Sequence, residues 1–79
     1  MVKVEVDKFG DIHVNLGSGF RTTVAVHYNP PYVWIEKQVT KGDRAGRWNI
    51  IAQLNGDQEL VDALRELATA LEKTLGVKK

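Results

Sequence analysis

The last quarter of the chain has the residue spacing of an amphipathic α-helix. Between residues 57 and 75, apolar side chains recur every three or four positions, which places them on one continuous stripe of a helix. Asp57 follows an Asn-Gly pair and is a typical N-cap, and Gly76 is typical of the position after a helix. The pattern therefore predicts a helix over residues 57–75, with a stripe of Leu60, Val61, Leu64, Leu67, Ala68, Leu71 and Leu75.

Residues 2–54 instead show the two-residue alternation of β-strands. Residues 2–7 alternate valine with charged residues, which predicts a half-buried first strand. Gly17-Ser18-Gly19 separates two further alternating runs and predicts a β-hairpin. A three-residue loop there pairs Ile12 with Val24 and gathers the apolar residues of both strands on one face. A one-residue slip would turn one strand inside out, which favours this register.

The run at residues 32–39 follows a strand break at Asn29-Pro30-Pro31 and is apolar on both faces at its start. We place Val33 beneath the helix and leave Tyr32 and Trp34 on the outside. A symmetric three-residue loop at the prolines would instead place Trp34 in the core. The sequence leaves these two orientations of Trp34 open.

Together these elements predict a single α+β domain over residues 1–79. An antiparallel, curved sheet of four to five strands spans residues 2–54, and the C-terminal helix packs on one of its faces. The last strand is predicted to turn one set of side chains inward, namely Trp48, Ile50, Ala52 and Leu54.

The composition restricts the class of protein. The chain of 79 residues has no cysteine, which excludes disulfides and cysteine–metal sites and favours a reducing compartment. Its alternating, charged amino terminus is unlike a signal peptide, and no apolar run approaches membrane-spanning length. We therefore expect a small soluble protein of the cytoplasm. The core of so short a chain is marginal, and oligomerisation would enlarge it.

The positive charge is unevenly distributed although the formal net charge is only +1. The loop before the last strand and its approaches contain one acidic residue, Asp43. The basic residues of the same region are Lys37, Lys41, Arg44 and Arg47.

The outer face of the predicted sheet and the basic loop together have the composition of a surface for single-stranded nucleic acid. On such surfaces aromatic rings stack on bases and basic side chains neutralise phosphates, with little sequence preference. We therefore predict a non-catalytic protein that binds single-stranded DNA or RNA. The predicted contact residues are Arg21, Tyr32, Trp34, Lys37, Lys41, Arg44 and Arg47.

A protein-interaction module is the alternative function, because Tyr, Trp and Arg are also enriched at protein interfaces. In that case the open face of the sheet docks another chain. The helical stripe is wider than a coiled-coil seam, so it is either entirely core or packs one flank on the sheet and the other on a partner helix. The second arrangement predicts a homodimer through the C-terminal helix.

Metal binding and catalysis have little support in the sequence. His13 and His27 lie on the same face, but their positions along paired strands are roughly 13 Å apart at about 3.3 Å per residue, too far to share an ion. Ser18, the only serine, lies in a hairpin tip without a histidine placed to activate it. We expect no enzymatic activity, metal or cofactor.

A curved antiparallel sheet, a C-terminal helix and exposed aromatic residues beside basic ones make the chain similar to small single-stranded DNA-binding proteins. It resembles the archaeal ThermoDBP family and, more distantly, the Whirly and positive-cofactor-four group, whose members dimerise and bind single strands. The resemblance covers the whole domain as a pattern of elements. It implies a cleft or curved sheet lined by aromatic and basic groups, and it adds Trp48, which alternation turns inward, as a stacking residue.

Overall fold

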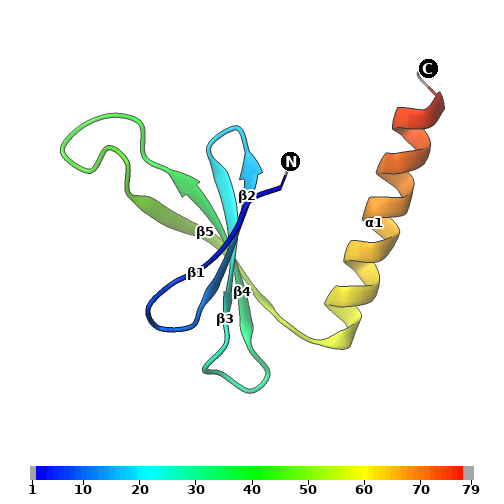
Figure 1. Cartoon of the computed structure of the whole chain (residues 1–79), viewed down its shortest axis with the longest axis horizontal. Helices are drawn as coiled ribbons and strands as arrows, with labels where there is room; N and C mark the ends of the chain where they lie inside the picture. Colours follow the sequence, from blue (N-terminus) through cyan, green and yellow to red (C-terminus); the bar gives the residue numbers. More distant parts are fainter. Residues whose placement is uncertain (1, 78–79) are drawn as a thin grey trace.

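The computed structural model describes residues 2–77 as a five-stranded sheet followed by one helix (Figure 1). The sheet is a meander in the order β1-β2-β3-β4-β5, and neighbouring strands are antiparallel. The predicted α+β class, antiparallel sheet and C-terminal helix are therefore confirmed. The elements are β1 (Val4–Val6), β2 (Ile12–Gly17), β3 (Phe20–Ala25), β4 (Tyr32–Gln38), β5 (Trp48–Asn55) and α1 (Gln58–Val77).

The β2–β3 hairpin has the predicted register over most of its length, with Ile12 opposite Val24. Near the tip the register shifts, so Gly17 pairs with Phe20 and the loop consists of two residues, Ser18 and Gly19, rather than three. Both loop residues have positive φ, 55° and 82°, which is the backbone conformation of a tight hairpin turn. The shortened loop leaves the pairing of the strand bodies unchanged.

A bulge in β5 changes which of its residues share a face. Ala52 pairs with Ile35, whereas Ile50 pairs with the next residue of β4, so Ile51 is an extra residue between them. Trp48 and Ile50 therefore lie on the face opposite that of Ala52. The predicted inward orientation of Trp48 and Ile50 is wrong, because strict alternation holds only in a strand without a bulge.

The two faces of the sheet differ in chemistry and in burial. On one, the polar face, Thr23 is 2% exposed and Glu36 is 6% exposed. On the other, the apolar face, Val33 is buried, but Val6 is 66% exposed. Apart from Ala25, which is 1% exposed, the most completely buried side chains of the sheet are thus polar. The polar face carries Glu5, His13, Arg21, Thr23, Tyr32, Trp34, Glu36 and Trp48, and the apolar face carries Val4, Val6, Ile12, Val14, Val24, Val33, Ile35 and Leu54.

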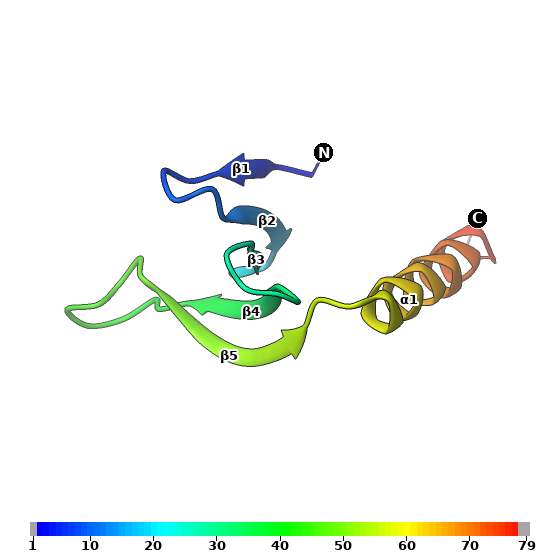
Figure 2. The ribbon, with the colours of Figure 1, turned by 90° about the horizontal axis from the view of Figure 1, so that it is seen from below.

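The helix α1 lies beside the sheet and not across it, as Figures 1 and 2 show from two directions. Its apolar stripe is exposed, for example 51% at Leu64 and 64% at Leu67. The predicted packing of the helix on a sheet face is therefore not observed. An apolar stripe indicates that a helix packs against a partner. It does not indicate whether that partner is the sheet of the same chain. Within residues 2–77, no helix has the length and apolar character needed to cross a membrane.

The sequence predicts the start of α1 correctly but not its end. At the start, the backbone N–H of Leu60 donates to Asp57 Oδ1 over 3.0 Å, which confirms the N-cap. At the other end the helix continues through Gly76 to Val77, beyond the predicted last residue 75. Gly76 is not among the residues with positive φ, so it does not form the left-handed cap that its type suggests.

Gly56 fixes the connection between β5 and α1. Its N–H donates to the carbonyl oxygen of Pro31 over 2.7 Å. A Cβ added to Gly56 would lie 2.8 Å from the same oxygen and 3.3 Å from a methyl group of Val33. The absence of a side chain therefore lets the chain leave the sheet in close contact with the β3–β4 turn.

We expect the Gly56→Ala variant to lower the free energy of unfolding by about 1–3 kcal/mol, because the backbone must move to relieve the contact with Pro31. Chemical denaturation followed by circular dichroism measures this change. Gly76→Ala is the matched control, since an added Cβ meets nothing within 4 Å there and alanine favours the helix. Equal stability of Gly56→Ala and the wild type would contradict the tight contact.

Candidate functional site

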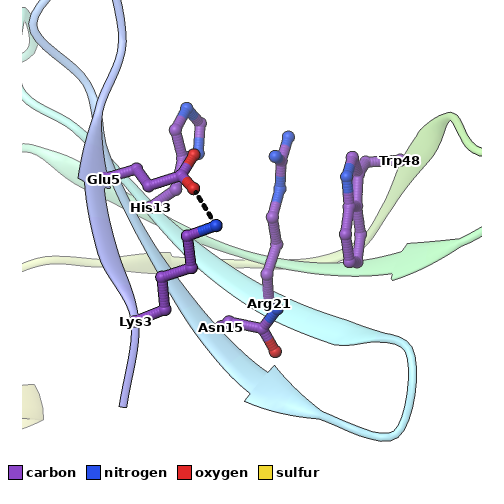
Figure 3. Close-up of a pocket in the computed structure, with 6 residues that line it drawn as sticks. All are labelled: Lys3, Glu5, His13, Asn15, Arg21 and Trp48. Carbon is purple, nitrogen blue, oxygen red and sulfur yellow. Dashed lines mark ion pairs between the residues drawn. The ribbon is translucent and has the colours of Figure 1, made fainter. Parts of the chain in front are cut away.

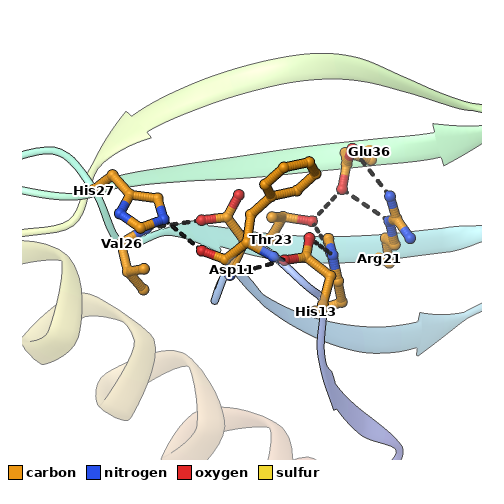
Figure 4. Close-up of polar contacts among 9 residues, drawn as sticks. Asp11, His13, Arg21, Thr23, Val26, His27 and Glu36 are labelled. Carbon is orange, nitrogen blue, oxygen red and sulfur yellow. Dashed lines mark hydrogen bonds and ion pairs between the residues drawn. The ribbon is translucent and has the colours of Figure 1, made fainter.

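The centre of the polar face is an ion pair between adjacent strands. Arg21 of β3 and Glu36 of β4 are partners in the strand register. The Nε of Arg21 donates to Glu36 Oε1 over 2.9 Å, and its Nη2 lies 3.5 Å from Oε2 (Figure 4). A buried carboxylate is stable only when it is paired and hydrogen-bonded, and Arg21 supplies both conditions.

A chain of hydrogen bonds continues from this ion pair across the sheet. The Thr23 hydroxyl donates to Glu36 Oε1 and lies 2.7 Å from Nδ1 of His13 (Figure 4). The Nε2 of His13 is 2.8 Å from Asp7 Oδ2. The network thus joins Asp7, at the end of β1, to Arg21 on β3 through residues of three strands. In the described part of the chain, no buried side-chain nitrogen or oxygen lacks a hydrogen-bond partner.

Asp7 is the acidic end of this network. The hydrogen bond from His13, together with those from the backbone N–H groups of Phe9 and Asp11, lowers the pKa of the Asp7 carboxyl below its usual value. Partial desolvation acts in the opposite direction and is outweighed. Asp7 is therefore a carboxylate at neutral pH, and its Oδ1 also closes the β1–β2 turn.

Arg21 also contacts Trp48, which lies on the same face in the edge strand β5. Its Cζ lies 4.6 Å from the centroid of the Trp48 ring, which is cation–π geometry. In Figure 3 the two side chains stand side by side above the strands. They border an open hollow of about 220 Å³ that is lined by Lys3, Glu5, His13, Asn15, Arg21 and Trp48. Within the hollow, Lys3 Nζ pairs with Glu5 Oε1 over 2.9 Å.

Two further aromatic side chains lie on the polar face. Trp34 is opposite Thr23 and Gln53, half-buried, and its indole N–H donates to Gln53 Oε1 over 2.9 Å. This position agrees with the outward orientation and not with the core alternative. Tyr32 lies two residues away on the same face, and its ring meets that of Tyr28 edge to face, with centroids 4.9 Å apart.

The predicted basic residues do not all join the aromatic ones. Lys37 lies in register with Phe20, on the apolar side of β4, and its Nζ is 5.8 Å from the Phe20 ring centroid. Lys37 therefore lies on the opposite side of β4 from Trp34, because side chains alternate between the two faces along a strand. Lys41, Arg44 and Arg47 are exposed in the β4–β5 loop.

The β4–β5 loop is held by its own backbone hydrogen bonds. The N–H of Val39 donates to the carbonyl of Arg47, and the N–H of Gly46 donates to the carbonyl of Val39, both over 2.8 Å. Figure 1 shows this loop projecting from the end of the sheet. Arg47, the last residue of the loop, immediately precedes Trp48, so the basic loop adjoins the aromatic residues of the polar face.

Sequence reasoning missed the polar network itself. The predicted pairing of Ile12 with Val24 also sets His13 opposite Thr23, as the structure confirms, but the sequence pattern gave no role to Asp7, Thr23 or Glu36. An acidic residue in mid-strand on the same face as Arg21 was the available signal. No cluster of three or more metal-ligating side chains occurs among the residues that the structure describes. His27 Nε2 instead contacts the carbonyl oxygen of Phe9.

Comparisons with protein-family models, curated proteins and solved structures find no match to this chain. The function therefore has to be inferred from the geometry of the polar face.

Asp7 should make the stability of the protein sensitive to acid. Because its pKa is lower in the folded state than its usual value, the stabilisation it provides is present above that usual value and is lost as pH falls through the folded-state value. We expect the difference in the free energy of unfolding between wild type and Asp7→Asn to be largest above about pH 5 and to shrink toward about pH 2.

Urea denaturation at a series of pH values measures this difference. Asp43→Asn, a substitution of an exposed aspartate in the β4–β5 loop, serves as the control. A difference between wild type and Asp7→Asn that is the same at every pH would show that the carboxylate charge of Asp7 does not contribute.

Proposed function

We propose that this chain is a non-catalytic protein that binds single-stranded DNA or RNA on its polar face, with little base specificity. The observation that supports this proposal is the placement of Tyr32, Trp34 and Trp48 on one face of the sheet, next to an exposed basic loop. This combination of stacking groups and cations is the one that sequence-tolerant single-strand binding requires.

The aromatic residues have the spacing of a stacking platform. Tyr32 and Trp34 are two residues apart on one strand, or about 7 Å at 3.3–3.4 Å per residue. Trp48 lies opposite Gln38, farther along the same face. Arg21 covers one side of the Trp48 ring, so we assign the other side to a base. Stacking of this kind contributes about 1–3 kcal/mol per base.

Phosphate contacts in this proposal come mainly from the loop. The charge of Arg21 is already paired with Glu36, so Arg21 orients Trp48 more than it neutralises phosphate. Lys41, Arg44 and Arg47 are exposed in the β4–β5 loop, so their charges are accessible to a polyanion. A strand that lies along the polar face toward this loop would meet aromatic groups first and cations at its end. Binding should therefore weaken as the salt concentration rises.

The chain acts as a homodimer through α1 in this proposal. The exposed stripe of α1 is a contiguous apolar surface of the kind that marks an interaction site. A second copy presents the same stripe, and the two would bury each other in an isologous, two-fold interface. The more distant resemblance to the Whirly and positive-cofactor-four group, whose members dimerise, is in keeping with this arrangement. We place the protein in the cytoplasm, in accordance with its lack of cysteine.

The alternative function, a protein-interaction module, is favoured by a different observation. The apolar face leaves Val4, Val6 and Leu54 exposed, and a protein partner would bury these side chains. The two functions differ in their dependence on salt. An interface centred on apolar side chains should keep its affinity at physiological ionic strength, whereas nucleic-acid affinity should fall steeply.

Binding can be tested by titrating the protein with oligothymidylate at low salt and following tryptophan fluorescence. We expect quenching, and we expect Trp34→Ala to weaken binding about 5- to 150-fold, which corresponds to the loss of one stacked base at 1–3 kcal/mol. Trp34→Phe should retain most of the affinity because an aromatic ring remains. Phe9→Ala removes an exposed ring from the β1–β2 turn and is the matched control. Unchanged fluorescence, or full affinity of a folded Trp34→Ala variant, would refute the proposal.

Dimerisation can be tested by sedimentation equilibrium. We expect the wild type to have twice the mass of one chain and Leu64→Lys to be monomeric, because an unpaired charge in the interface is costly. Glu66→Lys places the same side chain on the opposite side of the helix and should leave the dimer intact. A monomeric wild type at all concentrations would rule out the dimer.

A further inference from the structure

Two apolar surfaces of the chain are exposed in the structure of residues 2–77. One is the stripe of α1, and the other is the apolar face of the sheet, where Val4, Val6 and Leu54 are exposed. The two surfaces meet at the end of β5, because Leu54 and Leu60 line the same open hollow of about 310 Å³ between the sheet and the start of α1. The chain therefore presents an apolar corner, with the apolar face as one side and the helical stripe as the other.

The connection between β5 and α1 keeps this corner open. It consists of two residues, Gly56 and Asp57. The N–H of Gly56 donates to the carbonyl oxygen of Pro31, and the side chain of Asp57 caps the helix. Because both residues of the connection are held, the direction in which the helix leaves the sheet is fixed. The helix stands beside the sheet and not over its apolar face (Figures 1 and 2).

The chain exposes more surface than a compact protein of its size. Its accessible surface is 6522 Å². A compact monomer of the same mass, 8.8 kDa, has about 4,800 Å², so about 1,700 Å² is in excess. The radius of gyration is 14.5 Å, against about 12 Å for a compact domain of 79 residues. A dimer that buries the excess of both chains removes about 3,500 Å² from water, within the range of about 2,000–5,000 Å² typical of obligate homodimers.

The length of α1 matches the width of the apolar face. A helix of 20 residues is about 30 Å long at 1.5 Å per residue. Five strands separated by about 4.8 Å form a sheet about 19 Å wide. One helix laid across the strands therefore reaches from β1 to β5. Two helical stripes packed only against each other would leave the apolar faces of both sheets in water.

The charges of the sheet and of the helix are complementary. Residues 2–56 contain seven basic and five acidic side chains, which gives a net charge of +2 with neutral histidines. The helix contains two basic and four acidic side chains, which gives a net charge of −2. Opposite net charges favour contact of a helix with a sheet over contact of two helices of like charge.

We propose that a second copy of the chain fills the apolar corner, so that α1 of each copy lies across the apolar face of the other copy's sheet. This inference rests on the homodimer through α1 proposed above and specifies its contacts. The stripe is wider than a coiled-coil seam, so one flank meets the sheet of the second copy and the other flank meets its helix. The exchange is reciprocal, and one two-fold axis closes both contacts. The polar faces of both sheets remain open to a ligand.

The Val6→Lys variant tests the sheet side of this contact. Val6 is 66% exposed in the single chain, whereas in the dimer a lysine there is an unpaired charge beneath the helix of the second copy. We expect sedimentation equilibrium to give a dissociation constant at least about tenfold larger than that of the wild type. Ile50→Lys is the matched control, because Ile50 is similarly exposed, at 52%, on the polar face. A Val6→Lys dimer as tight as the Ile50→Lys dimer would overturn the proposal.

The contact can also be observed in the unmodified protein by isotope-filtered NMR. Carbon-13-labelled and unlabelled chains are unfolded together and refolded, so that mixed dimers form. We expect interchain nuclear Overhauser effects between the leucine methyl groups of α1 in one chain and the valine methyl groups of the apolar face in the other. Helix–sheet effects that occur only within one chain would show that α1 folds back on its own sheet, which would overturn the proposal.

The outcomes separate this inference from the proposals on which it rests. A dimer whose interchain effects join only the two helices refutes docking on the sheet and leaves the dimer through α1 in place. A monomer at all concentrations refutes both the dimer and the docking, and leaves the apolar face to a different protein. Neither result bears on the binding of oligothymidylate, which the fluorescence titration decides separately.

Discussion

The buried carboxylate of Glu36 is the constraint on which the rest of the sheet depends. An ion removed from water costs several kcal/mol unless its partners compensate for the lost hydration. Arg21 and Thr23 supply that compensation, and both lie on β3, next to β4. His13 and Asp7 extend the set to β2 and β1. The strands β2, β3 and β4 and the turn after β1 are thus linked by a polar network as well as by the backbone ladders.

The same arrangement leaves the apolar groups of the chain for other contacts. The valines of β1 and the leucines of α1 remain exposed, although burial of such side chains is the main stabilising term in folding. A chain that orders its polar face internally and exposes two apolar surfaces is suited to assembly through those surfaces. The polar face then remains available to a ligand. This division of roles is the physical reason for placing the dimer contact on α1 and the nucleic acid on the sheet.

Much of the fold could be predicted from the sequence, because the period of the apolar residues changes from two to 3.6 at a clear boundary. The register of Ile12 against Val24 followed from the pattern as well. The side of the sheet on which Trp48 lies could not be predicted, since an extra residue at Ile51 breaks the alternation without any distinctive residue type. The free-standing helix was also missed, because an amphipathic stripe does not identify its partner. Of the candidate site, the aromatic residues were predicted and the polar network was not.

The central claim is that single-stranded nucleic acid lies on the polar face. It is tested most directly by recording ¹H–¹⁵N NMR spectra while oligothymidylate is added to the labelled protein. The account predicts that the indole N–H signals of Trp34 and Trp48 and the Nε–H signal of Arg21 move together, while the amide signals of α1 stay in place. Changes confined to α1 or to the apolar face around Val6 and Val33 would contradict it.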